Sequence, residues 1–171
     1  RELERIFLII EANKYKLNST EDGELRKQIR RGVNYLLHNF VAAARTLVDH
    51  TRVFISENYQ ATVLQEKYQA KIAADIKSNK NCLFIHDLRN YMLHCGPPAL
   101  SIRTSITSGN KVDAGVHFIS SSLLEWNGWK SLSKEYIKER ANWIDIDDIA
   151  RTYSNTVVSL HSWLDLLLSE H

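Results

Sequence analysis

The sequence has little cysteine and no long hydrophobic run, and each absence excludes a class of protein. Its 171 residues include only two cysteines, Cys82 and Cys95, too few for the disulfide framework of a small secreted domain. If both lie on one helix, about 20 Å separates them, so they cannot pair. No apolar run approaches the ~20 residues of a membrane span, and no secretory signal is visible. We therefore expect a cytoplasmic protein that does not associate with membranes.

Several motifs of catalytic and metal sites are also absent. The sequence contains no Cys-x-x-Cys pair to support a structural zinc site. It has no glycine-rich phosphate loop, no serine or cysteine nucleophile motif and no paired-carboxylate site. We therefore expect no metal and no other cofactor. The net charge of +2 neither supports nor excludes nucleic-acid binding, because a local basic patch matters more than the total.

The amino-acid composition fits one soluble domain. Hydrophobic residues make up 44% and charged residues 25% of the chain, enough apolar surface for a core of ordinary size. We therefore treat residues 1–171 as a single domain. The chain begins at Arg1 and its only methionine is Met92, so we expect that the natural N-terminus lies further upstream.

Apolar residues recur at spacings of three and four over most of the chain, which predicts helices. The longest such segment predicts one helix from about Gly23 to about Glu57, with Gly32 as a weak point. The same periodicity predicts further helices at about 2–14, 64–76, 82–95, up to about 140, and 147–169.

The period changes to two after Pro98. Apolar and polar residues alternate over about 100–107 and again over 112–119, and Gly109-Asn110 between them suits a two-residue turn. This pattern predicts a β-hairpin. The expected fold is therefore mainly α: a bundle of four to five main helices with one inserted β-hairpin at about 100–119.

The most informative segment is the predicted helix over 82–95. It places a cation, an amide and an imidazole, Arg89, Asn90 and His94, on an otherwise apolar helix. At 100° per residue, His86, Asn90 and His94 share one side and Asp87 flanks them, while the apolar residues face the opposite side. A solvated helix face usually carries Lys and Glu, so this polar stripe is unusual.

The spacing Arg89-Asn90-x-x-x-His94 resembles the motif of the HEPN superfamily, a group of small helical domains. The resemblance is strict over about a dozen residues and architectural elsewhere, and the family does not require the hairpin. Many members are metal-independent ribonucleases of toxin–antitoxin, abortive-infection and CRISPR systems. The resemblance therefore implies an endoribonuclease of a toxin or phage-defence type, with RNA as substrate and an antitoxin or sensor as a further partner.

The resemblance also implies roles for the three motif residues. The ribose 2′-OH attacks the adjacent phosphate, His94 acts as acid or base, Arg89 stabilises the phosphate charge, and Asn90 positions the phosphate or the imidazole. Arg89 and His94 lie about 140° apart around the helix axis, so they do not converge on one atom. The family solves this with a homodimer, which we expect here with the motif near its two-fold axis.

The same residues allow other interpretations. Arg89 can pair with a carboxylate, and His94 can be a helix-end histidine favoured by the helix dipole. The alternative function is a non-catalytic HEPN-like module that binds nucleotide, RNA or another protein. His86 and Asp87 either tune His94 or are polar surface, and Tyr91 sits within the motif as a weak candidate for substrate contact.

Weaker candidates lie around the motif. A metal site along the polar stripe is disfavoured, because His86 and His94 are about 12 Å apart along the axis. Arg45, His50 and Arg52 can face the motif helix, but a solvated or internally paired role is the commoner one. The basic run at 26–31 can engage RNA phosphates or be a solvated face. Trp126 and Trp129 are core aromatics or a base-stacking pair.

Overall fold

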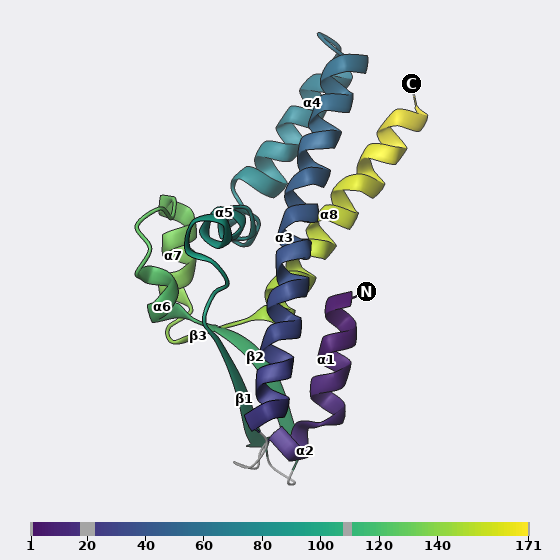
Figure 1. The fold of residues 1–171 in the computed structure, drawn as a ribbon. Coiled ribbons are helices and arrows are strands. Elements are labelled where there is room, and N and C mark those ends of the chain that lie inside the picture. The colour runs from purple at the N-terminus through teal and green to yellow at the C-terminus, as the bar shows by residue number, and fades with distance from the viewer. Residues whose placement is uncertain (1, 18–22, 108–110, 171) are drawn as a thin grey trace.

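The protein is a helical assembly built around a small antiparallel sheet (Figure 1). The computed structural model describes residues 2–17, 23–107 and 111–170. Its elements in chain order are α1 (Glu2–Ala12), α2 (Lys14–Leu17), α3 (Gly23–Asn58), α4 (Val63–Ile72), the π-helical turn η1 (Ala73–Lys77), α5 (Lys80–Cys95), β1 (Leu100–Thr107), β2 (Lys111–Ile119), α6 (Ser120–Leu124), α7 (Ser131–Glu139), β3 (Trp143–Asp145) and α8 (Ile146–Ser169).

The long helix α3 runs along most of the molecule (Figure 1). Its 36 residues span about 54 Å at 1.5 Å per residue. Ile29, Val33, Leu37 and Val41 are buried at intervals of four, so one stripe of the helix faces the core. The predicted helix is confirmed, and it continues without a break through Gly32. A Cβ at Gly32 would lie 3.1 Å from Ile6 Cδ1, so this glycine lets α1 approach closely.

The predicted hairpin is confirmed, and a third strand joins it. β1 pairs antiparallel with β2 from Leu100↔Phe118 to Thr107↔Lys111, while the predicted turn falls at residues outside those described. β3 pairs with the other edge of β2, which gives the strand order β1-β2-β3. The sheet is more than an insertion, because Phe118 and Ile144 are fully buried in the main core.

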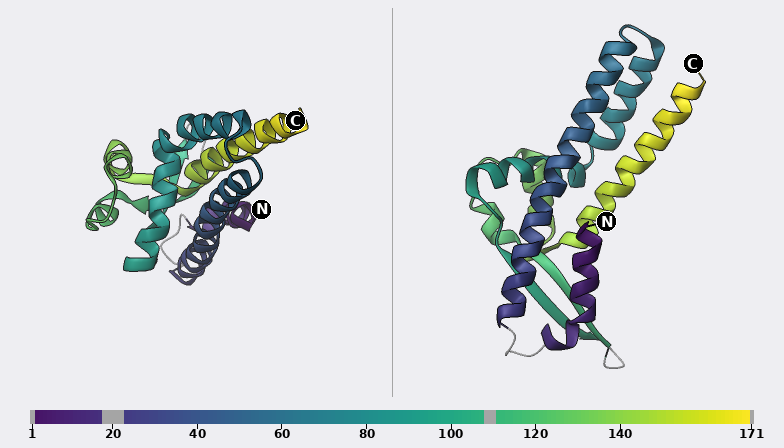
Figure 2. Two further views of the ribbon diagram at one scale, coloured as in Figure 1. Left: turned by 90° about the horizontal axis from the view of Figure 1, so that it is seen from above. Right: turned by 45° about the vertical axis from the view of Figure 1, so that its right-hand side comes forward.

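The helix α5 crosses the centre of the fold, between α3 and α7 (Figures 1 and 2). Asn79 caps its first turn by accepting hydrogen bonds from the amides of Asn81 and Cys82 at 3.0 and 3.2 Å. Gly96 ends it with φ of 86°, a conformation that favours glycine. The helix therefore begins two residues before the predicted start and ends at the predicted Cys95.

Aromatic packing fixes one side of α5. The Phe84 ring is fully buried and stacks on Tyr136 and Trp129, with centroid distances of 5.1 and 5.5 Å. Trp129 also donates from Nε1 to the carbonyl of Leu123 at 2.6 Å. These contacts bind α5 to the segment that leads into α7, so the side chains of α5 are held in defined positions.

The far end of the molecule is an arm of three helices. The C-terminal halves of α3 and α8 extend together with α4 away from the sheet (Figure 2), around a small second core of Ile55, Leu64, Tyr68, Leu164 and Leu167. The predicted helix over 64–76 is regular only to Ile72 and then passes into η1. In the part of the chain that the structure describes, no helix combines the length and apolar character that crossing a membrane requires.

Candidate functional site

The motif residues of α5 differ in how far they reach solvent. Arg89 and Asn90 are half-buried, and His94 is exposed in the last helical turn. Tyr91 is buried and stacks on Trp129 with 5.4 Å between centroids. Its burial also raises the pKa of the Tyr91 hydroxyl. Tyr91 therefore belongs to the core of this chain, and the weak prediction that it contacts substrate gains no support.

A polar cavity of about 150 Å³ lies beside the first half of the motif. Arg45 of α3 and Lys130, which directly precedes α7, line the cavity. The other lining residues lie on α5: His86, Asp87, Arg89 and Asn90. All of these side chains are polar. The cavity therefore brings Arg89 and Asn90 of the motif together with two cations from other parts of the chain, Arg45 and Lys130.

Arg89 is the least satisfied of these cations. Within residues 2–17, 23–107 and 111–170, its guanidinium makes no hydrogen bond and no ion pair. Arg45, by contrast, pairs through Nε with Asp49 Oδ2 at 2.9 Å. The interpretation in which Arg89 pairs with a carboxylate thus finds no partner among the described residues. A half-buried guanidinium has five N–H donors to satisfy, so the cavity is a place for an acceptor.

Asp87 is buried, so of the two interpretations left open for it, polar surface is wrong. Its carboxylate is 4% exposed, accepts a hydrogen bond from Ser133 Oγ at 2.7 Å, and lies 3.3 Å from Lys130 Nζ. Ser133 is in the first turn of α7, where the helix dipole favours a negative charge. Asp87 therefore ties α5 to the start of α7 and holds Lys130 at the cavity.

His86 is also buried rather than solvated, with 9% of its surface exposed. Its Nε2 lies 3.2 Å from the Tyr153 hydroxyl, and that hydroxyl donates to the carbonyl of Ala44 at 3.1 Å. Since the Tyr153 proton is already given to a carbonyl, the hydroxyl accepts from His86, and the proton of the neutral imidazole is on Nε2. Burial, and then the nearby Arg45, lower the pKa of His86 to about 4.

His94 lies outside this cavity, further along the same helix. Its ring stacks on Trp126 at 6.3 Å between centroids, and Trp126 in turn meets Trp129 edge to face at 5.1 Å. Trp129 is buried as expected for a core aromatic, whereas Trp126 is half-buried. The structure thus brings Arg89, Asn90, His86 and Asp87 together, and it places His94 next to an accessible indole.

Two cations outside the motif line the cavity. Arg45 does so although a solvated or internally paired role is the commoner one for such a residue, and Lys130 is not among the residues predicted from the sequence. Arg52 pairs with Asp49 at 3.7 Å and does not line the cavity. Two features of the sequence point to Lys130. It lies directly before a predicted helix, and a helical wheel places its partner Asp87 on the polar side of the motif helix.

The part of the chain that the structure describes contains no candidate metal site. No group of three His, Cys, Asp or Glu side chains there could hold a metal ion. Cys82 and Cys95 both lie on α5 and are free, the first buried and the second exposed. Burial raises the pKa of the Cys82 thiol to about 11.

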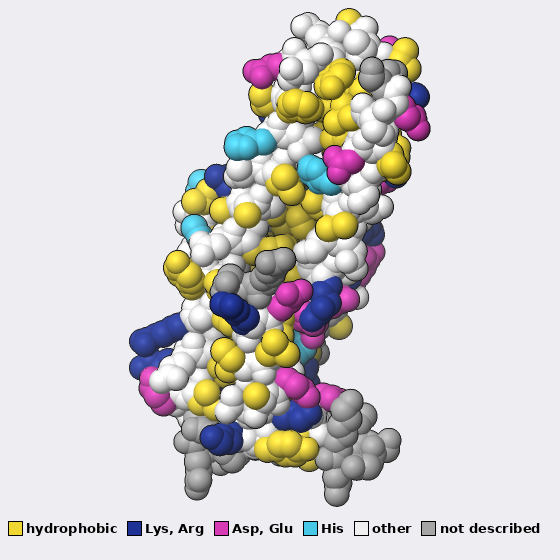
Figure 3. Space-filling model, turned by 90° about the vertical axis from the view of Figure 1, so that its right-hand side faces the viewer, with side chains coloured by type: hydrophobic (Ala, Val, Ile, Leu, Met, Phe, Trp, Pro, Cys, Tyr) yellow, Lys and Arg dark blue, Asp and Glu magenta, His cyan; other side chains and the backbone are white. Residues whose placement is uncertain are grey.

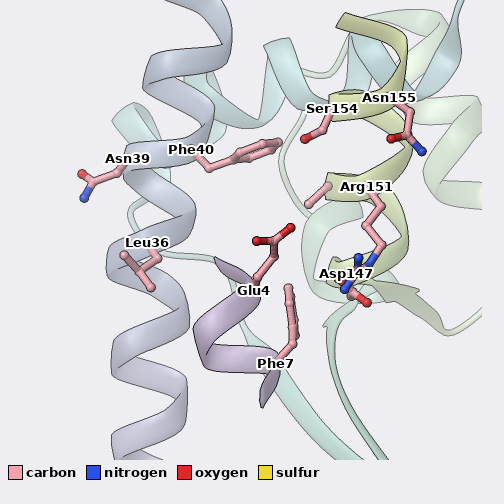
Figure 4. Close-up of a pocket in the computed structure, with 10 residues that line it drawn as sticks. Glu4, Phe7, Leu36, Asn39, Phe40, Asp147, Arg151, Ser154 and Asn155 are labelled. Carbon is pink, nitrogen blue, oxygen red and sulfur yellow. Dashed lines mark hydrogen bonds and ion pairs between the residues drawn. The ribbon is translucent and has the colours of Figure 1, made fainter. Parts of the chain in front are cut away.

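A second cavity, of about 310 Å³, lies between α1, α3 and α8 (Figure 4). Hydrophobic side chains gather in a hollow on this face of the molecule (Figure 3). The Phe40 ring forms part of the cavity wall, the Glu4 carboxylate points into the space beside it, and the Asp147–Arg151 pair lies on the α8 side (Figure 4). Among the described residues, its lining mixes apolar with polar and charged side chains and includes no histidine or cysteine.

Comparison with known proteins identifies no relative. No family model, no curated protein and no solved structure matches this chain.

Proposed function

We propose that this chain is a metal-independent endoribonuclease of the HEPN type, with its site on the Arg89–His94 segment of α5. The state of Arg89 carries the proposal. Its half-buried guanidinium has no partner in the described part of the chain, in a cavity that two further cations line. Burying a cation without a compensating acceptor is costly, and a phosphate group of RNA supplies the missing charge.

The proposed reaction requires only groups of the protein and the RNA. The 2′-oxygen of a ribose attacks the adjacent phosphorus, and the bond from phosphorus to the 5′-oxygen breaks. The products are a 2′,3′-cyclic phosphate and a 5′-hydroxyl. His94 accepts the proton of the 2′-OH or donates one to the leaving oxygen, Arg89 binds the phosphate oxygens as charge builds, and Asn90 positions them. DNA lacks the 2′-OH and is not a substrate.

The proposed site requires two copies of the chain. Arg89 and His94 lie about 140° apart around α5, and His94 does not line the cavity that holds Arg89. In a homodimer whose two α5 helices meet near a two-fold axis, Arg89 of one copy and His94 of the other face the same phosphate. Light scattering in solution tests this directly, and a strictly monomeric protein would contradict it.

The deciding experiment is cleavage of total RNA and of tRNA by the purified protein in EDTA, with Arg89→Ala and His94→Ala beside it. The proposal expects cleavage by wild type alone, with 2′,3′-cyclic phosphate or 3′-phosphate ends. Loss of His94 should slow cleavage by about 10²–10⁴-fold. Cleavage by His94→Ala at the wild-type rate would show that the mechanism is wrong.

One observation favours a second candidate, a non-catalytic RNA-binding module of the same family. Catalytic histidines are usually oriented by a hydrogen-bonded partner, and the only described contact of the His94 side chain is the stack on Trp126. The two candidates separate in the same experiment. RNA binding by a folded, dimeric protein without cleavage at any concentration would favour the binding module.

A further inference from the structure

The cavity beside Arg89 contains more positive charge than its own residues neutralise. Arg45, Arg89 and Lys130 face it; among the described residues Asp87 is the one carboxylate that lines it, and Asp49 outside it pairs with Arg45, so one positive charge remains in excess. The imidazole of His86 adds no charge near neutral pH, because its pKa is about 4. A small enclosed space with excess positive charge and polar walls suits an anion.

The donors of these cations are only partly used. Arg45 pairs with Asp49 through Nε, so both of its terminal amino groups remain for another acceptor. Lys130 Nζ lies 3.3 Å from one oxygen of Asp87, which leaves further N–H donors. Its side chain is 72% exposed while that of Asp87 is 4% exposed, so the ammonium is at the cavity mouth and its counter-charge is at the base.

We propose that Arg45 and Lys130 complete, with Arg89, a binding pocket for one backbone phosphate of single-stranded RNA. The proposal rests on the proposed function, because it names the residues that hold the substrate at that site. Arg45 comes from α3, Arg89 from α5 and Lys130 from the start of α7, so the pocket forms only when these three helices are packed. Two guanidiniums and an ammonium from three separate parts of the chain offer several charged donors, and a phosphate has oxygens to accept them.

Binding is measured with a short single-stranded RNA that carries 2′-O-methyl groups on every ribose. This RNA cannot be cleaved through its 2′-oxygens, so its affinity is independent of any catalytic step. Arg45→Gln and Lys130→Gln should each weaken binding about tenfold, because a hydrogen bond to a charged group contributes at least about that factor. Lys138→Gln is the matched control, since it removes the same charge from an exposed position of α7 outside the cavity, and it should change affinity less than twofold.

A competition experiment identifies the phosphate itself. Inorganic phosphate at pH 7 should displace the RNA from wild type more strongly than potassium chloride at equal ionic strength. In Arg45→Gln this difference should vanish. Equal competition by both salts in wild type, or equal RNA affinity of Arg45→Gln and Lys138→Gln, would overturn the pocket. If Lys130→Gln fails to fold because it leaves Asp87 unpaired, Arg45→Gln decides alone.

The outcomes separate this inference from the proposed function. RNA cleavage by wild type together with normal RNA affinity of Arg45→Gln refutes the pocket and leaves the ribonuclease. A tenfold loss of affinity in Arg45→Gln without cleavage by wild type supports the pocket and refutes the ribonuclease. Wild-type protein that does not bind the methylated RNA at all overturns the pocket.

Discussion

Replacing His86 with glutamine tests whether a buried, neutral imidazole makes this fold sensitive to mild acid. Burial, and then Arg45, lower the pKa of His86 from 6.5 to about 4. The folded protein therefore binds this proton less readily than the unfolded chain does. The stability that His86 contributes is fully present above pH 6.5 and is lost as the pH falls toward 4.

The expected magnitude follows from the size of the shift. A shift from 6.5 to about 4 corresponds to about 3 kcal/mol when the pH is below both values, at 1.36 kcal/mol per unit. Most of the loss falls in an accessible range: between pH 7 and pH 5 the free energy of unfolding should decrease by about 2 kcal/mol through His86 alone.

Urea unfolding of wild type and His86→Gln at pH 7 and pH 5 measures this contribution. Glutamine keeps a donor for the Tyr153 hydroxyl and does not titrate, so the variant should lose about 2 kcal/mol less than wild type over this range. The control is His50→Gln at an exposed position of α3. It measures how replacing a solvent-exposed histidine with glutamine changes stability.

The half-exposed carboxylate of Asp145 interferes little in this range. Burial favours the neutral form of Asp145, but hydrogen bonds from His117 and from backbone amides outweigh it and lower the pKa below 3.8. The stability that Asp145 contributes is therefore lost below pH 3.8, outside the measured range. Equal losses in wild type and His86→Gln between pH 7 and pH 5 would refute a neutral, buried His86.

Three further substitutions test other parts of the structure. Arg89→Gln should slow RNA cleavage by about 10²–10³-fold and should leave the urea-derived free energy of unfolding unchanged or raise it, because it removes a half-buried charge that has no described partner. Tyr153→Phe should cost about 1–3 kcal/mol in the same assay, because it removes the hydroxyl that accepts from the buried His86 and donates to the carbonyl of Ala44. Gly128→Ala places a Cβ 2.2 Å from Trp126 Cζ2, so it should shift the tryptophan emission spectrum and destabilise by about 1–3 kcal/mol; an unchanged spectrum would contradict the packing.

The sequence was sufficient to predict the helices and the hairpin because their periods are long and regular. The buried residues of α3 recur every three or four positions from Ile29 to Ala44, so their period can be read from the sequence. The three residues of β3 give no period at all, and this strand exists only because it pairs with the edge of β2. The change from α4 to η1 also leaves no pattern in the sequence.

The candidate site was predictable only in part. The motif identifies Arg89 and Asn90, but the helical pattern leaves open whether His86 and Asp87 are exposed, and the structure buries both. Because α3 and α7 pack against α5 on both sides, these side chains are buried and find partners in Tyr153 and Ser133. Which cations face them depends on how the helices cross, and a single helical wheel does not contain that information.

The two cysteines of α5 have a practical consequence. Cys95 is exposed next to His94, whereas Cys82 is fully buried with a pKa of about 11, so thiol reagents should modify the first and spare the second. The natural chain thus has one chemical handle beside the proposed reaction centre. A nitroxide attached there would report, by electron spin resonance, how far apart two motif helices lie when two molecules associate.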